Sequence, residues 1–267
     1  MMKVFISADI EGVSGTTTFT EASRDEVVYQ EFRDQMVRET AAACEGALAA
    51  GATEILVKDA HGGANNLVAA DLPRPTQLVR GWSGHPFCMV QELDESFDCV
   101  LFVGYHARAG ATGNPLSHTL SSSKLHRIFL NERSASEFLI HYYAAATLDV
   151  PVVLLTGDET ICAEVYDTDP NIYTVAVKDG HGASTVNMHP HEAVETIRTV
   201  SEAAVSHARE ISPGLVPEET NLRLVYKDQK IAYRCSQYPG AILVEPYTVG
   251  FRSTDYFEIL RALVFLV

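Results

Sequence analysis

Cysteine is scarce in this chain of 267 residues, and the five cysteines are widely scattered, with no C-x-x-C pair. This excludes a disulfide framework and a thiolate zinc site, and we expect all five thiols to be reduced. Long apolar runs are also lacking, since none approaches the roughly 18 to 20 residues that a membrane-spanning helix needs. The N-terminus leads directly into a strand, without the layout of a signal peptide. We therefore predict a cytoplasmic protein with no membrane partner.

Basic residues are also few relative to acidic ones. The chain has 20 lysines and arginines against 35 aspartates and glutamates, which gives a formal net charge of -15. Because nucleic acids attract basic surfaces, this balance excludes a nucleic-acid partner. The sequence contains neither G-x-x-x-x-G-K-S/T nor G-x-G-x-x-G, so nothing indicates a nucleotide. The absence of G-x-S-x-G and H-E-x-x-H disfavours a serine hydrolase and a zincin.

The most informative stretch is residues 4–12, an apolar strand followed by a glycine-containing turn. Side chains alternate along a strand, so Asp9 and Glu11 point to the same side. In open α/β sheets, ligands bind beyond the C-terminal ends of the strands, which is where these two carboxylates lie. Two like charges so close together are unfavourable unless a proton or a cation lies between them. A metal ion is the natural candidate.

Similar strands recur along the chain and predict the fold class. Ser23 and Glu26 have the spacing of a capping box that opens a long helix, and Gly51 ends that helix. A strand, a helix and a second strand form a βαβ unit with parallel strands. We therefore predict an α/β protein with three α/β/α layers and a largely parallel central sheet. The further expected strands are residues 54–59, 99–104, 151–156 and 172–177.

The C-terminal part is expected to be a smaller α/β appendage. We predict a core of residues 1–215 that carries the metal site, and a C-terminal portion of residues 216–267 that packs on the core or at a subunit interface. The last helix, from Ser253, ends in the apolar stretch 262–267. This stretch is too apolar to face water, so an interface within or between subunits should cover it.

Histidines follow two of the predicted strands. His61 and His106 are expected at the same sheet edge as Asp9 and Glu11, and together they form an oxygen and nitrogen donor set that suits zinc. Taken alone, each carboxylate is more simply interpreted as a turn or helix-cap residue, and each histidine as a hydrogen-bonded loop residue, than as a metal ligand. Glu137 has capping-box spacing from Ser134, and His118 could be a solvated loop residue. The remaining histidines show no comparable grouping and are interpreted as bystanders: His85, His126, His141, His181, His189, His191 and His207.

Several of these motifs together resemble a known family, the zinc-dependent D-aminopeptidases associated with dipeptide-transport operons. The resemblance runs over most of the chain, including residues 239–261. The D-x-E-G and G-Y-H-A-R motifs in this order are specific. The matching segments are S-A-D-I-E-G-V-S-G at 7–15, K-D-A-H at 58–61 with N-N at 65–66, G-Y-H-A-R-A at 104–109, S-H-T at 117–119, and Asn131.

This resemblance implies an activity, an assembly and a site. Family members act on D-amino-acid peptides such as D-Ala-D-Ala and form ring-shaped decamers that enclose their active sites. The resemblance therefore implies the same activity and a homo-oligomer, with a decameric ring as its expected form. His118 matches the additional catalytic residue of the family. Matching positions would give a site for two zinc ions made of Asp9, Glu11, His61, His106 and Glu137.

The expected mechanism is attack by a metal-activated water on a short peptide with a free N-terminus, with Asp9 bridging the metals. His118 would stabilise the oxyanion or transfer a proton. Asp59, Asn65 and Arg108 are candidates to support the ligands. The same ligands would tolerate manganese or cobalt. Two alternatives remain open at this stage: another binuclear metal hydrolase acting on a phosphoester or a different amide, and a non-catalytic oligomeric metal-binding protein.

Overall fold

The computed structural model describes residues 2–267 and contains a central sheet of seven strands, in the order β3-β2-β1-β4-β7-β8-β9. All neighbours in this sheet are parallel except β8 and β9, which are antiparallel. The prediction of a largely parallel central sheet is therefore confirmed. The strands are β1 (Lys3–Ala8), β2 (Glu54–Asp59), β3 (Thr76–Val79), β4 (Cys99–Tyr105), β7 (Val152–Asp158), β8 (Tyr173–His181) and β9 (Ser184–Asn187).

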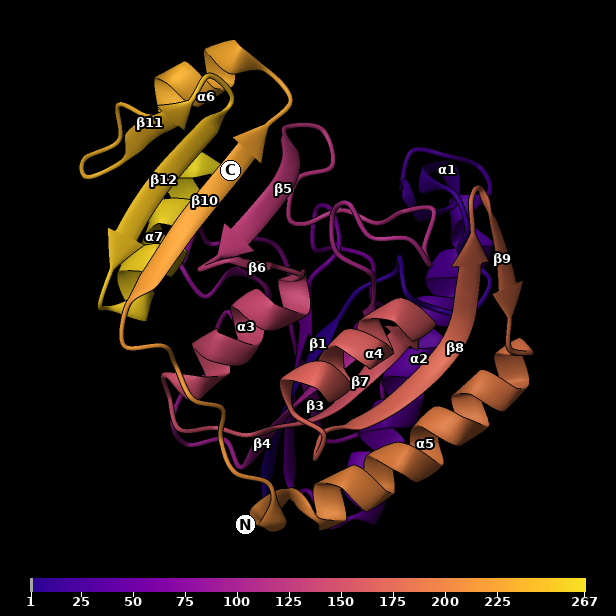
Figure 1. Ribbon diagram of the computed structural model, residues 1–267. Helices are drawn as coiled ribbons and strands as arrows, with labels where there is room; N and C mark the ends of the chain where they lie inside the picture. Colours follow the sequence, from indigo (N-terminus) through magenta and orange to yellow (C-terminus); the bar gives the residue numbers. More distant parts are fainter. Residues whose placement is uncertain (1) are drawn as a thin grey trace.

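Helices cover both faces of this sheet, which confirms the three-layer architecture (Figure 1). Side chains alternate along β1, so that Val4 and Ile6 pack in the same apolar cluster as α2 and α5. Phe5 points to the other face and joins the cluster that contains α3 and α4. The helices of these two layers are α2 (Tyr29–Ala49), α5 (Pro190–Ser206), α3 (Glu137–Ala146) and α4 (Glu159–Thr168).

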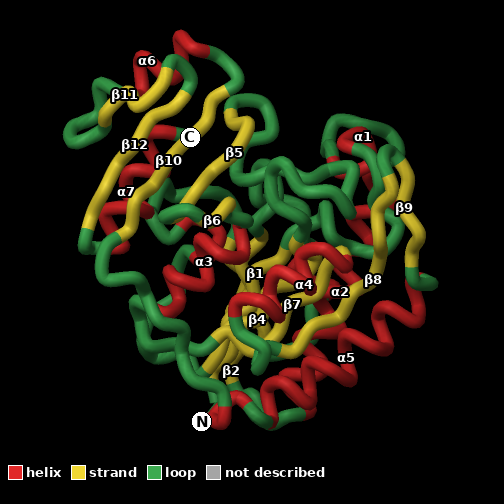
Figure 2. Tube along the Cα trace, viewed as in Figure 1, coloured by secondary structure: helices red, strands yellow, loops and turns green. Residues whose placement is uncertain are grey.

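A second, antiparallel sheet has the order β11-β12-β10-β5-β6 and appears at the upper left of Figures 1 and 2. One of its C-terminal strands, β10, pairs with β5 of the earlier chain, for example through Leu224 and Ile128. The division at residue 215 remains a prediction. The elements are β5 (Leu125–Leu130), β6 (Arg133–Ser134), β10 (Thr220–Tyr226), β11 (Ile242–Glu245), β12 (Thr248–Ser253), α6 (Gln229–Cys235) and α7 (Tyr256–Leu266).

The predicted start of the long helix differs from the structure. The capping box is formed by Thr18 and Glu21 of a short helix, α1, and not by Ser23 and Glu26. The carboxylate of Glu21 accepts the backbone N–H of Thr18 at 2.8 Å, and the long helix α2 begins only at Tyr29. The structure also contains elements that the sequence did not predict, namely β3, β6, β9, β12, α4 and α6. The remaining short helices are α1 (Phe19–Ala22), η1 (Ala69–Asp71), η2 (Cys88–Val90) and η3 (Ala208–Glu210).

The apolar C-terminus is partly covered within the chain. Leu263 and Leu266 of α7 are buried in the same cluster as α3. The backbone carbonyl of Leu266 accepts the Tyr226 hydroxyl at 2.9 Å. Phe265 instead stays 66% exposed and stacks on the ring of Tyr238. Among the residues described here, no helix is long and apolar enough to cross a membrane.

Glu39 is a buried carboxylate that joins α2 to the turn after β1. Its Oε1 accepts the N–H of Ser14 and an N–H of the Gln35 side chain, both at 2.9 Å, whereas its Oε2 has no hydrogen-bond partner. Burial raises the pKa of Glu39 to about 7. In the unfolded chain the carboxyl group loses its proton near pH 4.5, so the folded protein binds more protons between these two values. Stability must therefore fall as the pH rises through this window.

This imbalance predicts a pH effect that Glu39→Gln removes. Between pH 5 and pH 8, we expect the free energy of unfolding of the wild type to fall by about 2–3 kcal/mol relative to the variant. Denaturant titrations of both proteins at the two pH values measure this difference. Glu45→Gln is the matched control, because Glu45 lies on the same helix but is exposed and pairs with Arg198. Parallel losses in wild type and Glu39→Gln would contradict the prediction.

Candidate metal centre

Three neighbouring strands deliver the predicted ligands to one edge of the central sheet. Asp9 follows β1, His61 follows β2 and His106 follows β4, and these strands lie side by side in the order β2-β1-β4. The backbone continues the sheet past the strand ends, since the N–H of Asp9 donates to the carbonyl of Val103 at 2.8 Å. Parallel register therefore brings the three side chains together, as the sequence predicted.

Asp9, Glu11 and His61 form the first cluster. Nδ1 of His61 lies 2.9 Å from Glu11 Oε2 and 3.2 Å from Asp9 Oδ1. The other ring nitrogen of His61, Nε2, lies 2.8 Å from the carbonyl oxygen of Ala22 in α1. These distances are far within the span of a two-ion site, whose ions lie about 4 Å apart.

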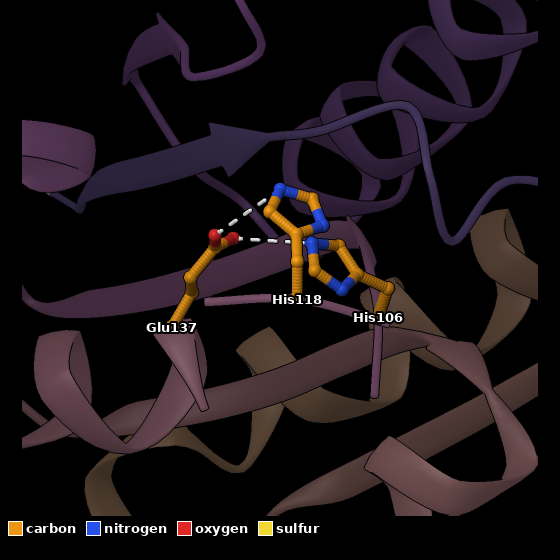
Figure 3. Close-up of side chains that lie close together, drawn as sticks. All are labelled: His106, His118 and Glu137. Atoms are coloured by element: carbon orange, nitrogen blue, oxygen red, sulfur yellow. Dashed lines mark ion pairs between the residues drawn. The ribbon is translucent and has the colours of Figure 1, made fainter. Parts of the chain in front are cut away.

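His106, His118 and Glu137 form the second cluster (Figure 3). Nε2 of His106 lies 3.3 Å from Glu137 Oε2, and Nε2 of His118 lies 3.8 Å from Glu137 Oε1. The two imidazole rings stack with their centroids 4.4 Å apart. Asp9 connects the clusters, because its Oδ2 lies 3.7 Å from His106 Nε2. The structure thus brings all five predicted ligands and His118 together.

The three imidazoles share one orientation. Each directs one ring nitrogen at the carboxylates and the other at a backbone carbonyl: Ala22 for His61, Ala107 for His106 and Leu116 for His118. A carbonyl can only accept, so the outer nitrogen carries the proton in each ring. The inner nitrogen of a neutral imidazole is then unprotonated and faces the clusters, which is the arrangement of metal-binding histidines.

The carboxylates of the clusters are deeply buried, since Asp9, Glu11 and Glu137 are at most 4% exposed. Burial and the neighbouring charge of Glu11 raise the pKa of Asp9 well above its ordinary value. Burial opposes ionisation of Glu137, but the charges of His106 and His118 outweigh it and lower the pKa of Glu137 to about 2. Three buried carboxylates therefore require positive charge beside them.

The histidines respond to the same charges. Burial disfavours the charged form of His106, yet the Glu137 carboxylate raises the pKa of His106 to about 10. The pKa of His61 is also raised, because the charge of Glu11 outweighs the cost of burial. In the protein alone, protons on the imidazoles supply the positive charge that the carboxylates demand. Divalent cations would supply the same compensation.

The start of α3 shows that Glu137 does not form a capping box with Ser134. Ser136, not Ser134, is the N-cap, and its hydroxyl accepts the N–H of Leu139 at 3.0 Å. The Glu137 side chain is thereby free to point into the second cluster, where Oε1 also accepts the N–H of Leu120 at 2.7 Å.

Asp59, one of the predicted supporting residues, is connected to the backbone carbonyl of His61 through Asn66. Asp59 accepts the N–H and the side-chain amide of Asn66, whose amide also donates to the carbonyl of His61 at 2.7 Å. The sequence assigned this role to Asn65, but the structure gives the contact to its neighbour Asn66. The carbonyl of Asn65 instead accepts hydrogen bonds from the side chains of two arginines, Arg24 and Arg80.

Arg108 lies behind the second cluster. Its Nε is 3.7 Å from Oε2 of Glu164 on α4. The other carboxylate oxygen of Glu164 accepts the Ser136 hydroxyl at 2.7 Å. Arg108 is therefore connected through Glu164 to the N-cap of the helix that begins with Glu137, and it contacts neither cluster directly.

A polar network that the sequence did not reveal holds the turn that carries Glu11. The buried Lys178 donates to the carbonyls of Glu11 and Thr16, the latter at 2.5 Å. Asn114 donates to the same Glu11 carbonyl at 3.1 Å and to Asp158 at 2.9 Å. The turn is also packed tightly against β4, since a Cβ on Gly12 would lie 1.8 Å from the carbonyl oxygen of Tyr105. Only glycine fits there.

Both clusters border a pocket of about 960 Å³. Asp9, Glu11, His61, His118 and Glu137 line it, so that the ligand candidates face a space open to substrate. The lining also includes residues that the sequence had not selected, among them Trp82, and the supposed bystanders His85 and His141. Burial lowers the pKa of His141 to about 4, which keeps this ring neutral at pH 7.

The chain is similar to known proteins over nearly its whole length. The family model of D-aminopeptidases, peptidase M55, matches residues 2–265. A D-aminopeptidase of Bacillus subtilis strain 168 is 31% identical over 265 residues, covering 98% of this chain and 96% of that protein.

A solved structure agrees over the same extent. It is the Zn-dependent D-aminopeptidase DppA from Bacillus subtilis, a self-compartmentalizing protease, with a TM-score of 0.93 and 29% identity. The match covers 99% of this chain and 96% of that one. The resemblance found in the sequence motifs is thereby confirmed: the chain belongs to the peptidase M55 family of D-aminopeptidases.

Proposed function

We propose that this protein is a zinc-dependent D-aminopeptidase that removes the first residue from short D-amino-acid peptides, with two zinc ions in each subunit. The family assignment supports peptide hydrolysis, and the names of both relatives support zinc and D-residues. The observation that carries the proposal is the shared orientation of the three imidazoles: each gives one ring nitrogen to a backbone carbonyl and turns the other, which is free to bind a cation when the ring is neutral, toward buried carboxylates.

The residues present fit two zinc ions. Glu11 Oε2 and His106 Nε2 are buried and lie beside other members of the two clusters, at 2.9 Å from His61 Nδ1 and 3.3 Å from Glu137 Oε2, which suits atoms that share a cation. We assign Asp9, Glu11 and His61 to one ion, and His106 and Glu137 to the other. Asp9 would contact both ions, because one of its oxygens faces His61 of the first cluster and the other faces His106 of the second. Imidazole nitrogen and carboxylate oxygen are a donor set suited to zinc.

When bound, zinc supplies a Lewis acid that polarises the scissile carbonyl and lowers the pKa of a bound water. The chain itself supplies the proton carrier. His118 donates its Nδ1 proton to the Leu116 carbonyl at 2.8 Å, which fixes the ring with Nε2 facing Glu11 and Glu137. We assign His118 Nε2 to proton transfer, because His118 lines the pocket and its Nε2 faces the carboxylates of Glu11 and Glu137.

We further propose that subunits assemble into a ring of ten, with the active sites enclosed, in the cytoplasm. The relative of known structure is described as self-compartmentalizing. In this chain, an apolar strip on β11 supports assembly, because Ile242, Leu243 and Val244 are 63%, 40% and 49% exposed. Light scattering of the purified protein measures the particle mass.

One experiment tests the metal and the reaction together. We expect about two equivalents of zinc per chain in the isolated protein, and faster hydrolysis of D- than of L-aminoacyl p-nitroanilides. A chelator should abolish the activity and added zinc should restore it. p-Nitrophenyl phosphate serves as the control substrate for a phosphoesterase. Turnover of this phosphate ester without any release from aminoacyl amides would overturn the proposal, as would bound zinc without any turnover.

A further inference from the structure

Trp82, the only tryptophan of the chain, lies in the loop after β3 and lines the same pocket as Asp9, Glu11 and His61. Its indole Nε1 donates to the carbonyl of Gly62 at 2.7 Å. Because Gly62 directly follows His61, this hydrogen bond anchors the indole beside the first cluster. The residue is nevertheless 40% exposed, which is unusual for so large an apolar side chain.

Lys58 covers one face of this indole. Its ammonium group lies 4.0 Å from the centre of the ring, a cation–π contact. The lysine is fully buried, and its ammonium donates to the carbonyl of Gly81 at 2.7 Å. Burial lowers the pKa of Lys58 to about 8. The hydrogen bond to the Gly81 carbonyl fixes the ammonium group, and the cation–π contact of this group then holds the indole.

The pocket beside the indole is large and is lined by both polar and apolar residues. Its volume of about 960 Å³ is at the upper end of the range for pockets that enclose drug-sized ligands. A peptide of two alanines would leave most of this space unfilled. Apolar side chains line the pocket together with Trp82: Phe19, Met89, Ile140, Leu260 and Leu263. Such walls favour a substrate that brings an apolar side chain of its own.

We propose that Trp82 determines substrate specificity, with its indole, backed by Lys58, forming the surface on which an aromatic or large aliphatic side chain of the substrate's first D-residue packs. This inference rests on the proposed function, because an aminopeptidase holds the first residue of its substrate at the metal centre. The indole is anchored at Gly62 beside His61, so it lies next to that position. The preferred substrates are therefore peptides that begin with residues such as D-phenylalanine or D-leucine.

Kinetics with two substrates test the proposal. For Trp82→Ala, we expect kcat/KM for D-phenylalanine p-nitroanilide to fall by roughly tenfold or more, and that for D-alanine p-nitroanilide by less than about threefold. Trp82→Phe should retain most of the preference, since it keeps an aromatic ring. Tyr166→Ala is the matched control, because Tyr166 is an exposed aromatic residue that does not line the pocket. Zinc content should be the same in all four proteins.

Tryptophan fluorescence gives a readout that does not need turnover. Because Trp82 is the only tryptophan, selective excitation reports on this loop alone. We expect a saturable change in emission with D-phenylalaninamide and a much weaker response to D-alaninamide. Equal losses of kcat/KM for both substrates in Trp82→Ala, or equal responses to both amides, would overturn the role of Trp82. If the wild type cleaved no aminoacyl amide, the proposed function would fail, and the titration would still decide whether Trp82 selects large side chains.

Discussion

Replacement of Asp9 by alanine is expected to remove both zinc ions and to lower kcat/KM by at least about a thousandfold. Asp9 belongs to the first cluster and also reaches the second, with Oδ1 at 3.2 Å from His61 Nδ1 and Oδ2 at 3.7 Å from His106 Nε2. Loss of its carboxylate would remove one donor from each of the two proposed zinc ions. Lewis-acid catalysis contributes several kcal/mol, and about 4 kcal/mol corresponds to a thousandfold change in rate.

The metal content distinguishes this role from that of a ligand to a single ion. Glu11→Ala removes a donor from the first cluster only, so we expect this variant to keep about one equivalent of zinc, whereas Asp9→Ala keeps none. Elemental analysis after gel filtration measures both. Asp179→Ala is the matched control, because its carboxylate is partly exposed and pairs with the surface residue His181. Two equivalents of zinc in Asp9→Ala would show that this carboxylate does not hold the ions.

The first cluster could be predicted because its geometry is local. Asp9 and Glu11 lie in one turn, and His61 follows the strand that a single βαβ unit places next to β1. The strand before His106 is also recognisable as an apolar run. Its parallel pairing with β1 places His106 beside Asp9. Where the order of strands follows from the order of apolar runs, the sequence is sufficient to bring the ends of these strands together.

The second sheet and the far side of the pocket could not be predicted, because they depend on long-range packing. β5 pairs with β10, whose residues are about 90 positions later in the chain. No local pattern indicates that partner. The contacts of Lys178 with the Glu11 carbonyl and of Lys58 with Trp82 also join distant segments. Both lysines lie in strands, where a single charged residue ordinarily indicates a position that faces water.

The helix starts show how local patterns compete. Ser23 and Glu26 fit a capping box as well as Thr18 and Glu21 do, and sequence spacing does not rank them. Other contacts decide instead: the Ser23 hydroxyl donates to the Phe19 carbonyl at 2.5 Å, and the carbonyl of Ala22 in α1 lies 2.8 Å from His61 Nε2. The same holds for α3, where the cap at Ser136 frees Glu137 for the second cluster. Side-chain contacts with distant residues therefore determine the helix boundaries next to the site.

Removal of the His118 imidazole is expected to lower kcat by roughly a hundredfold to ten thousandfold, the usual contribution of a general acid or base, while both zinc ions stay bound. Its Nε2 lies 3.8 Å from Glu137 and 4.0 Å from Glu11, farther than His106 lies from Glu137. The residue is also more accessible than His106, with 15% of its side chain exposed against 1%. Both features favour a proton carrier that faces substrate over a metal ligand.

The contrast between His118→Ala and His106→Ala tests this assignment, because the two rings stack on each other and differ mainly in depth. His106→Ala should lose about one zinc ion together with its activity, whereas His118→Ala should lose activity alone. The pH profile adds a second readout, since loss of a proton carrier should remove one limb of the dependence of kcat on pH. If His118→Ala also loses a zinc ion, His118 is a ligand of the second cluster, and a different residue must transfer the proton.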